Sequence, residues 1–204
     1  MSKSALVARS ALDREARAGR HGNLGAEPGV ILGERAGLGI ASIMARKGMS
    51  EAASAAAKAA FGAALPLTPR RVAGQGVAFL WSGPDRWLAM TEDRSSEDLA
   101  QLLAGIFSRL ASVAEQGDGR AVIRISGPRA RDVLAKGFAI DVHPRAFQPG
   151  DTAVTGAAHI EVQIWQLDDA PTYEITLFRG FAGSFWHWLT QAAAEYGYAV
   201  ATDL

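Results

Sequence analysis

The four histidines are the residues of this chain whose type first suggests catalysis or metal binding. They are His21, His143, His159 and His187, and no two of them stand at the i, i+2 or i, i+4 spacing of a metal site on a strand or helix. His159 lies two residues before Glu161, so these two side chains could form a general acid–base pair. A solvated strand edge is the alternative, and we favour it.

Motifs for nucleotide binding or nucleophilic catalysis are weak or absent. Residues 37–42 (GLGIAS) match half of a dinucleotide fingerprint, but the third glycine is missing and no clear strand precedes them. The sequence has no cysteine, which excludes disulfides, thiolate nucleophiles, Cys-ligated zinc and iron–sulfur clusters. We therefore predict no catalytic, cofactor-binding or metal-binding residue in this chain.

Large aromatic residues outside the expected core suggest contact with another protein. A helical stripe on the last helix contains Phe185, Trp188 and Leu189, and Trp186 falls beside this stripe. Trp165 falls on the polar face of its strand. Because exposed aromatics are enriched at interfaces, we predict that Trp165 and Trp186, with the neighbouring His187, contact a partner. Helices that cover both faces of the sheet are the alternative explanation.

The composition predicts a folded, soluble chain. About half of the 204 residues are apolar, and 21 basic residues balance 21 acidic ones. This neutral balance argues against a nucleic-acid partner. No stretch reaches eighteen uninterrupted apolar residues, and Arg9, Asp13 and Arg14 interrupt the N-terminal segment where a secretory signal would have its apolar core. We expect a cytoplasmic protein with no membrane partner.

Hydrophobic periodicity predicts an α+β fold. Strands are expected at 39–46, 77–82, 86–92 and 121–126, and helices at 50–64 and after Ser95, which with Asp98 resembles a capping box. This order, β-α-β-β-α-β, is that of a split βαβ, or ferredoxin-like, unit. The remaining elements nearly repeat it: a helix from Pro128 to before Gly137, strands at 152–156, 158–167 and 172–178, a helix at 182–196 and a short last strand. We predict two related halves, 38–126 and 121–204, that share the strand 121–126.

The first 37 residues differ in composition from the body at 38–204. Basic residues outnumber acidic ones, and glycines recur. Such a segment has little to bury and much backbone entropy to lose on folding. We predict either a disordered tail or a basic arm, with Arg9, Arg14 and Arg17 as contacts, that becomes ordered on a partner.

Four motifs carry a resemblance to a known family. They are GPDRWLAM at 83–90, DGRAVIRISGPRARDVLAKG at 118–137, IDVHPRAFQPG at 140–150 and FRGFAGSFWHWL at 178–189. Together they resemble the gamma-subunit family of heterotetrameric sarcosine oxidase, and the likeness runs over residues 38–204. That family is similar in fold to the folate-binding aminomethyltransferase domain of the glycine cleavage system. The resemblance therefore implies an aminomethyltransferase-like α+β domain.

The resemblance also implies partners and cofactors. It implies a complex with alpha, beta and delta subunits that oxidises sarcosine to glycine, with hydrogen peroxide and 5,10-methylenetetrahydrofolate as further products. NAD and tetrahydrofolate are implied on alpha, FAD on beta, FMN between these two, and zinc on delta, with no cofactor on this chain. Aminomethyltransferases use an aspartate near the strand that opens the second half, for which Glu115 and Asp118 are the nearest candidates.

These observations favour a non-catalytic subunit that supports a flavin-dependent oxidase, with the basic arm and the exposed aromatics docked on alpha. Two alternatives stay open. One is a stand-alone folate-binding module related to the iron–sulfur maintenance proteins. The other is a small aminomethyltransferase-like enzyme, which would need Glu115, Asp118, Arg124 and His159 to converge in one pocket.

Overall fold

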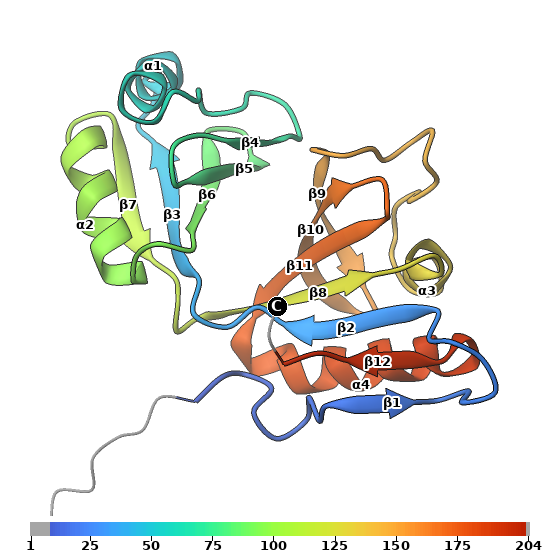
Figure 1. Ribbon diagram of the computed structural model, residues 1–204. Helices are drawn as coiled ribbons and strands as arrows, with labels where there is room; N and C mark the ends of the chain where they lie inside the picture. The colour runs from blue at the N-terminus through green and yellow to red at the C-terminus, as the bar shows by residue number, and fades with distance from the viewer. Residues whose placement is uncertain (1–8, 203–204) are drawn as a thin grey trace, which may run out of the picture.

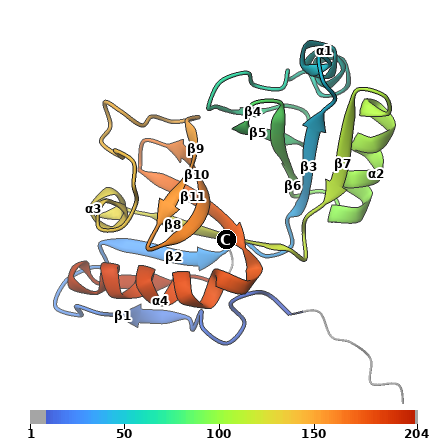
Figure 2. The same cartoon turned by 180° about the vertical axis from the view of Figure 1, so that it is seen from behind.

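The computed structural model of the chain describes residues 9–202. Its strands form two sheets, a small sheet of five strands and a large sheet of seven. Each sheet carries helices on the face turned away from the other sheet, as Figure 1 and the reverse view in Figure 2 show. The predicted α+β class is confirmed.

The small sheet is antiparallel, with the strand order β4-β5-β6-β3-β7. The helices α1 and α2 cover its outer face. The bounds of these elements are β3 Gly39–Ala45, α1 Ser50–Phe61, β4 Arg71–Ala73, β5 Ala78–Gly83, β6 Arg86–Thr91, α2 Ser96–Phe107 and β7 Ala111–Glu115.

Apart from the additional short edge strand β4, the elements β3-α1-β5-β6-α2-β7 follow the β-α-β-β-α-β order, but the last strand of this order is 111–115 and not 121–126. The strand at 121–126 belongs to the large sheet alone, so the two sheets do not share it. Sequence reasoning missed β7 because it is an edge strand with one buried residue, Ala111, and no apolar alternation.

The large sheet has the order β1-β12-β2-β8-β11-β10-β9. The helices α3 and α4 pack on its outer face, and short 3-10 turns flank α4 at Arg179–Phe181 and Ala194–Tyr196. The bounds of these elements are β1 Gly19–His21, β2 Val30–Glu34, β8 Arg120–Ser126, α3 Ala130–Ala135, β9 Thr152–Ala157, β10 Ile160–Asp168, β11 Thr172–Phe178, α4 Ala182–Ala193 and β12 Tyr198–Val200.

The N-terminal segment is part of the large sheet, which corrects the predicted boundary at residue 37. Strand β2 lies between β8 and β12, and β12 has β1 and β2 as its neighbours. Val30 and Leu32 are fully buried. Gly29 reflects close packing and not disorder, because a Cβ there would lie 2.9 Å from Tyr196 Cβ. The body of the fold therefore begins before residue 38.

The helix α2 begins as predicted. The Ser95 hydroxyl accepts a hydrogen bond from the Asp98 backbone N–H at 3.1 Å and donates one to the Asp98 carboxylate at 2.7 Å. The sequence places Leu99, Leu102, Leu103 and Phe107 at helical spacing, as one apolar stripe. Leu99, Leu103 and Phe107 are fully buried against the sheet, whereas Leu102 is 37% exposed. The buried face is therefore narrower than the apolar stripe in the sequence.

We expect Ser95→Ala to lower the free energy of unfolding by about 0.5–2 kcal/mol, because the Asp98 backbone N–H loses its acceptor. Urea denaturation followed by circular dichroism measures this loss. Ser112→Ala, at an exposed position of β7, is the matched control and is expected to change stability by less than about 0.5 kcal/mol. Equal midpoints for the two variants would argue against the capping role.

The inner faces of the two sheets pack on each other through a third apolar cluster. The small sheet contributes four side chains to it and the large sheet contributes Val122 and Trp165. The four are Ile40, Leu80, Leu88 and Met90. This cluster fixes the separation of the sheets, so polar groups beside it are held between two rigid layers.

Candidate functional site

A buried carboxylate, Glu174, organises the polar residues between the sheets. It lies on β11, and its side chain is 8% exposed. Its Oε1 accepts hydrogen bonds from Arg35 Nε at 3.0 Å and from Arg124 Nη2 at 2.6 Å, while its Oε2 accepts from Trp165 Nε1 at 3.0 Å. A buried charge with three such donors is held in one orientation.

Arg35 connects this carboxylate to the small sheet. Its guanidinium also pairs with Glu92, which follows β6 directly. Arg71 lies beside the same two carboxylates; burial lowers the Arg71 pKa, and the nearby charges of Glu174 and Glu92 act in the opposite direction. These residues line a cavity of about 250 Å³. Because Arg35 pairs with Glu174 of the large sheet and with Glu92 of the small-sheet side, this cluster links the two sheets.

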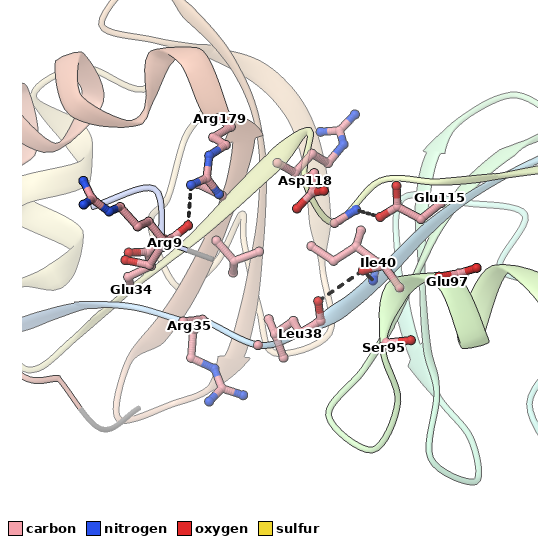
Figure 3. Close-up of a pocket in the computed structure, with 18 residues that line it drawn as sticks. Arg9, Glu34, Arg35, Leu38, Ile40, Ser95, Glu97, Glu115, Asp118 and Arg179 are labelled. Atoms are coloured by element: carbon pink, nitrogen blue, oxygen red, sulfur yellow. Dashed lines mark hydrogen bonds between the residues drawn. The ribbon is translucent and has the colours of Figure 1, made fainter. Parts of the chain in front are cut away.

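A larger cavity of about 860 Å³ lies where the N-terminal segment crosses from one sheet to the other (Figure 3). On its large-sheet side, the Glu34 carboxylate accepts hydrogen bonds from the Ala11 and Leu12 backbone N–H groups at 2.8 and 2.9 Å. The Arg179 guanidinium donates to the Arg9 carbonyl oxygen. These contacts tie the N-terminal segment to the wall of the cavity.

The opposite wall of this cavity comes from the start of α2 and the turn after β7. Ser96 Oγ accepts a hydrogen bond from the Ile40 backbone N–H at 2.9 Å. The Glu115 carboxylate accepts from the Gly117 backbone N–H, and Asp118 lies in the same turn (Figure 3). Most of these polar side chains therefore fix loops. The cavity has the volume of a small-molecule site and an ionic lining of mixed sign.

The structure brings together only part of the polar set that a small transferase would need. Glu115 and Asp118 both line the larger cavity. Arg124 is paired with Glu174 and lines neither this cavity nor its neighbour. His159 is exposed in the tight turn between β9 and β10, with φ +66°, and not on the strand face expected for it. The four residues do not converge.

Trp165 and Trp186 are both buried, so the prediction that they are exposed is wrong. Trp165 is 1% exposed because the small sheet covers the strand face that was expected to meet solvent. Trp186 is 4% exposed and packs in the core of the large sheet. The reason is that the buried face of α4 is wider than the stripe in the sequence and also includes Trp186 and Ala193, next to Phe185 and Ala192.

The other four predicted contact residues have exposed side chains. Arg9, Arg14, Arg17 and His187 are all exposed. Arg17 and His187 line one cavity of about 330 Å³, although 170 residues separate them in the chain. Arg9 lines the larger cavity instead. Arg9 therefore lines a different cavity from Arg17 and His187, and Arg14 lines neither of the two.

Sequence reasoning missed Glu174 and Arg35, and it named Arg124 only as a group that a small transferase would need. A signal was present, because Glu174 and Arg124 each interrupt an apolar strand, TYEITLF and AVIRIS. A charge inside such a strand needs a counter-charge. The two residues are direct cross-strand neighbours in the register of β11 and β8.

Two general properties hold for residues 9–202. Within this range, no three His, Asp or Glu side chains are grouped as a metal ion would require. No described helix is long and apolar enough to cross a membrane.

The fold is of the aminomethyltransferase type. The structure of the glycine cleavage system aminomethyltransferase T from Bartonella henselae matches it with a TM-score of 0.62 at 14% identity. The match covers 87% of this chain and 49% of that chain. At this identity the likeness shows the fold alone, and it confirms the predicted aminomethyltransferase-like α+β class.

Closer relatives define the family. Residues 46–195 match the sarcosine oxidase, gamma subunit family. The sarcosine oxidase subunit gamma of Arthrobacter sp. is 35% identical over 147 residues, 71% of this chain and 71% of the relative. That of Corynebacterium sp. (strain P-1) is 35% identical over 144 residues, 70% of each chain.

A solved structure agrees with this relationship. A chain of the heterotetrameric sarcosine oxidase from Corynebacterium sp. U-96, in complex with pyrrole 2-carboxylate, matches with a TM-score of 0.78 and 29% identity. The match covers 93% of this chain and 96% of that chain. The chain belongs to the sarcosine oxidase gamma subunit family, which confirms the resemblance carried by the four motifs.

Proposed function

We propose that this chain is the gamma subunit of a cytoplasmic heterotetrameric sarcosine oxidase, and that it supports the complex without taking part in the reaction. The observation that carries this proposal is the match to one chain of such a heterotetramer over nearly the whole length of both chains. In this proposal the alpha, beta and delta subunits bind FAD, FMN, NAD, zinc and tetrahydrofolate. Arg9, Arg14, Arg17 and His187, all exposed, contact the alpha subunit.

The pairing of the polar groups between the sheets supports a structural role. Glu174 accepts hydrogen bonds from Arg35, Arg124 and Trp165. Along the larger cavity, Glu34 and Ser96 accept from backbone N–H groups. Groups held in this way stabilise loops and sheets, whereas a catalytic acid or base must face the reacting atoms.

Co-expression tests the proposal. The tagged chain, produced with the other three subunits, is expected to co-purify with them, with flavin absorbance and with sarcosine-dependent hydrogen peroxide formation. The chain produced alone is expected to bind no flavin and to leave sarcosine unchanged. Turnover of sarcosine by the chain alone would refute a non-catalytic role, and failure to co-purify would refute the subunit assignment.

A folate-binding module is the second candidate, and the cavity of about 860 Å³ with Glu115 and Asp118 in its lining favours it. It differs from the first candidate in one measurable respect. Titration calorimetry of the isolated chain with tetrahydrofolate gives micromolar binding if this candidate is right, and no heat of binding if the chain acts through its partners alone.

A further inference from the structure

Arg120 differs from Arg35 and Arg124 because its charge lacks a close counter-charge. It begins β8, and its guanidinium stacks over the Phe178 ring, 4.8 Å from the ring centroid. Its Nε is buried without a hydrogen-bond partner. Within residues 9–202, no carboxylate oxygen lies within 4.0 Å of its nitrogens. Arg35 and Arg124, in contrast, are both paired with Glu174.

The surroundings of Arg120 leave this charge poorly balanced. Burial lowers the Arg120 pKa, and Glu161 on the neighbouring part of the sheet raises it by a smaller amount. Arg86, exposed at the start of β6, adds a second positive charge to the same cavity wall. The lining of this cavity therefore has two guanidinium groups and one carboxylate, a net positive charge.

Arg120 also contributes to the lining of two cavities. It lines the cavity of about 860 Å³ on one side and a cavity of about 220 Å³ on the other. In the smaller cavity, Phe178 and Val154 are 47% and 44% exposed although both are large apolar side chains. We call Arg86, Arg120, Val154, Glu161 and Phe178 the Arg120 groove. It combines exposed apolar surface with an uncompensated positive charge.

We propose that the Arg120 groove binds an extended segment of a partner subunit, which places a carboxylate against Arg120 and an apolar side chain against Phe178 and Val154. A polypeptide fits better than a small ligand for two reasons. The smaller cavity, at about 220 Å³, is below the usual range of small-molecule sites. Arg120 also lines the larger cavity, so a chain bound at Arg120 has a second cavity along which it can extend. This inference rests on the proposed function of the chain as a subunit.

The test is association of the full-length chain with the alpha, beta and delta subunits, measured as a dissociation constant at about 0.15 M salt. Arg120→Gln is expected to weaken association at least about tenfold, because the carboxylate of the partner loses its counter-charge. Arg109→Gln is the matched control, since Arg109 is exposed just after α2 and lies outside every cavity described above. It is expected to change the constant by less than about twofold.

A second variant keeps the test valid if Arg120→Gln does not fold. Phe178→Ser changes a half-exposed residue at the end of β11, and it is expected to weaken association about tenfold with little change in the thermal midpoint. Folded variants that associate as tightly as the wild type, in a complex that does assemble, would overturn this inference and leave the proposed function intact. A wild-type chain that does not associate with the other subunits would overturn both.

Discussion

Deleting residues 1–37 is expected to abolish cooperative folding of the chain, and not simply to remove a tail. The deletion removes β1 and β2, the two strands that pair with β12. Because β2 also pairs with β8, the deletion removes one of the two neighbours of β8 as well. It also removes Val30 and Leu32, both fully buried, and burial of such a side chain stabilises a protein by about 1.5–3 kcal/mol. Because whole domains are stable by only about 5–15 kcal/mol, these losses are expected to leave no single folded state. Circular dichroism and urea denaturation of the truncated chain provide the measurement.

Two adjacent positions of β2 provide a matched pair of controls. Leu32 is fully buried, whereas Ile31 is 42% exposed. Leu32→Ala is expected to lower the free energy of unfolding by about 2–5 kcal/mol, and Ile31→Ala by less than about 1 kcal/mol. A truncated chain with the wild-type urea midpoint, together with equal effects of the two substitutions, would show that the segment is dispensable.

This result affects how the basic residues near the N-terminus can be studied. Arg9, Arg14 and Arg17 precede β1 in a segment that the Glu34 carboxylate ties to the sheet through the Ala11 and Leu12 backbone N–H groups. A truncation that removes the arginines together with β1 and β2 would damage the fold before it tested any contact with a partner. Point substitutions of the three arginines separate the two effects.

Helix starts and turns that depend on residues close together in the chain could be predicted from the sequence. Ser95 starts α2 because its hydroxyl accepts from a backbone N–H three residues later, and Gly83-Pro84-Asp85 joins β5 and β6 because these residue types favour a turn. The family resemblance rested on four local motifs, and it too is confirmed. Signals of this kind depend on residues that are close together in the chain.

Features that depend on distant residues could not be predicted in the same way. Alternation along β10 shows that Gln163 and Trp165 share a face, but it does not show that a second sheet covers this face. The strand β2 was missed for a related reason. Its five residues become a strand because β8 and β12 lie on either side, and β12 comes more than 160 residues later in the chain.

The same limit applies to the candidate site. Glu174 and Arg124 are 50 residues apart, and only the register of β11 against β8 makes them neighbours. Arg35 reaches Glu174 because the chain crosses from the large sheet to the small sheet at that residue. Sequence alone could have indicated that each charge needs a partner, but not which partner it has.

Replacing Glu174 is expected to be among the most destabilising single substitutions in the chain. Glu174→Gln keeps the shape of the side chain but leaves the Arg124 guanidinium without its counter-charge and the Arg35 guanidinium with the exposed Glu92 alone. It also turns an acceptor into an N–H₂ donor. Removing one partner from a buried ion pair lowers the free energy of unfolding by about 3–5 kcal/mol. Urea denaturation measures this loss. Trp165 fluorescence is expected to shift, because the indole N–H loses its hydrogen bond to Oε2.

Glu92→Gln is the matched control for this substitution, because Glu92 pairs with the same Arg35 but has a side chain that is 71% exposed. Exposed ion pairs contribute about 0–1 kcal/mol, so Glu92→Gln is expected to be nearly silent. The contrast between the two variants separates a charge that holds the sheets together from one that lies at their rim. If Glu174→Gln were as mild as Glu92→Gln, the apolar cluster around Trp165 would hold the two sheets together without help from the ion pairs.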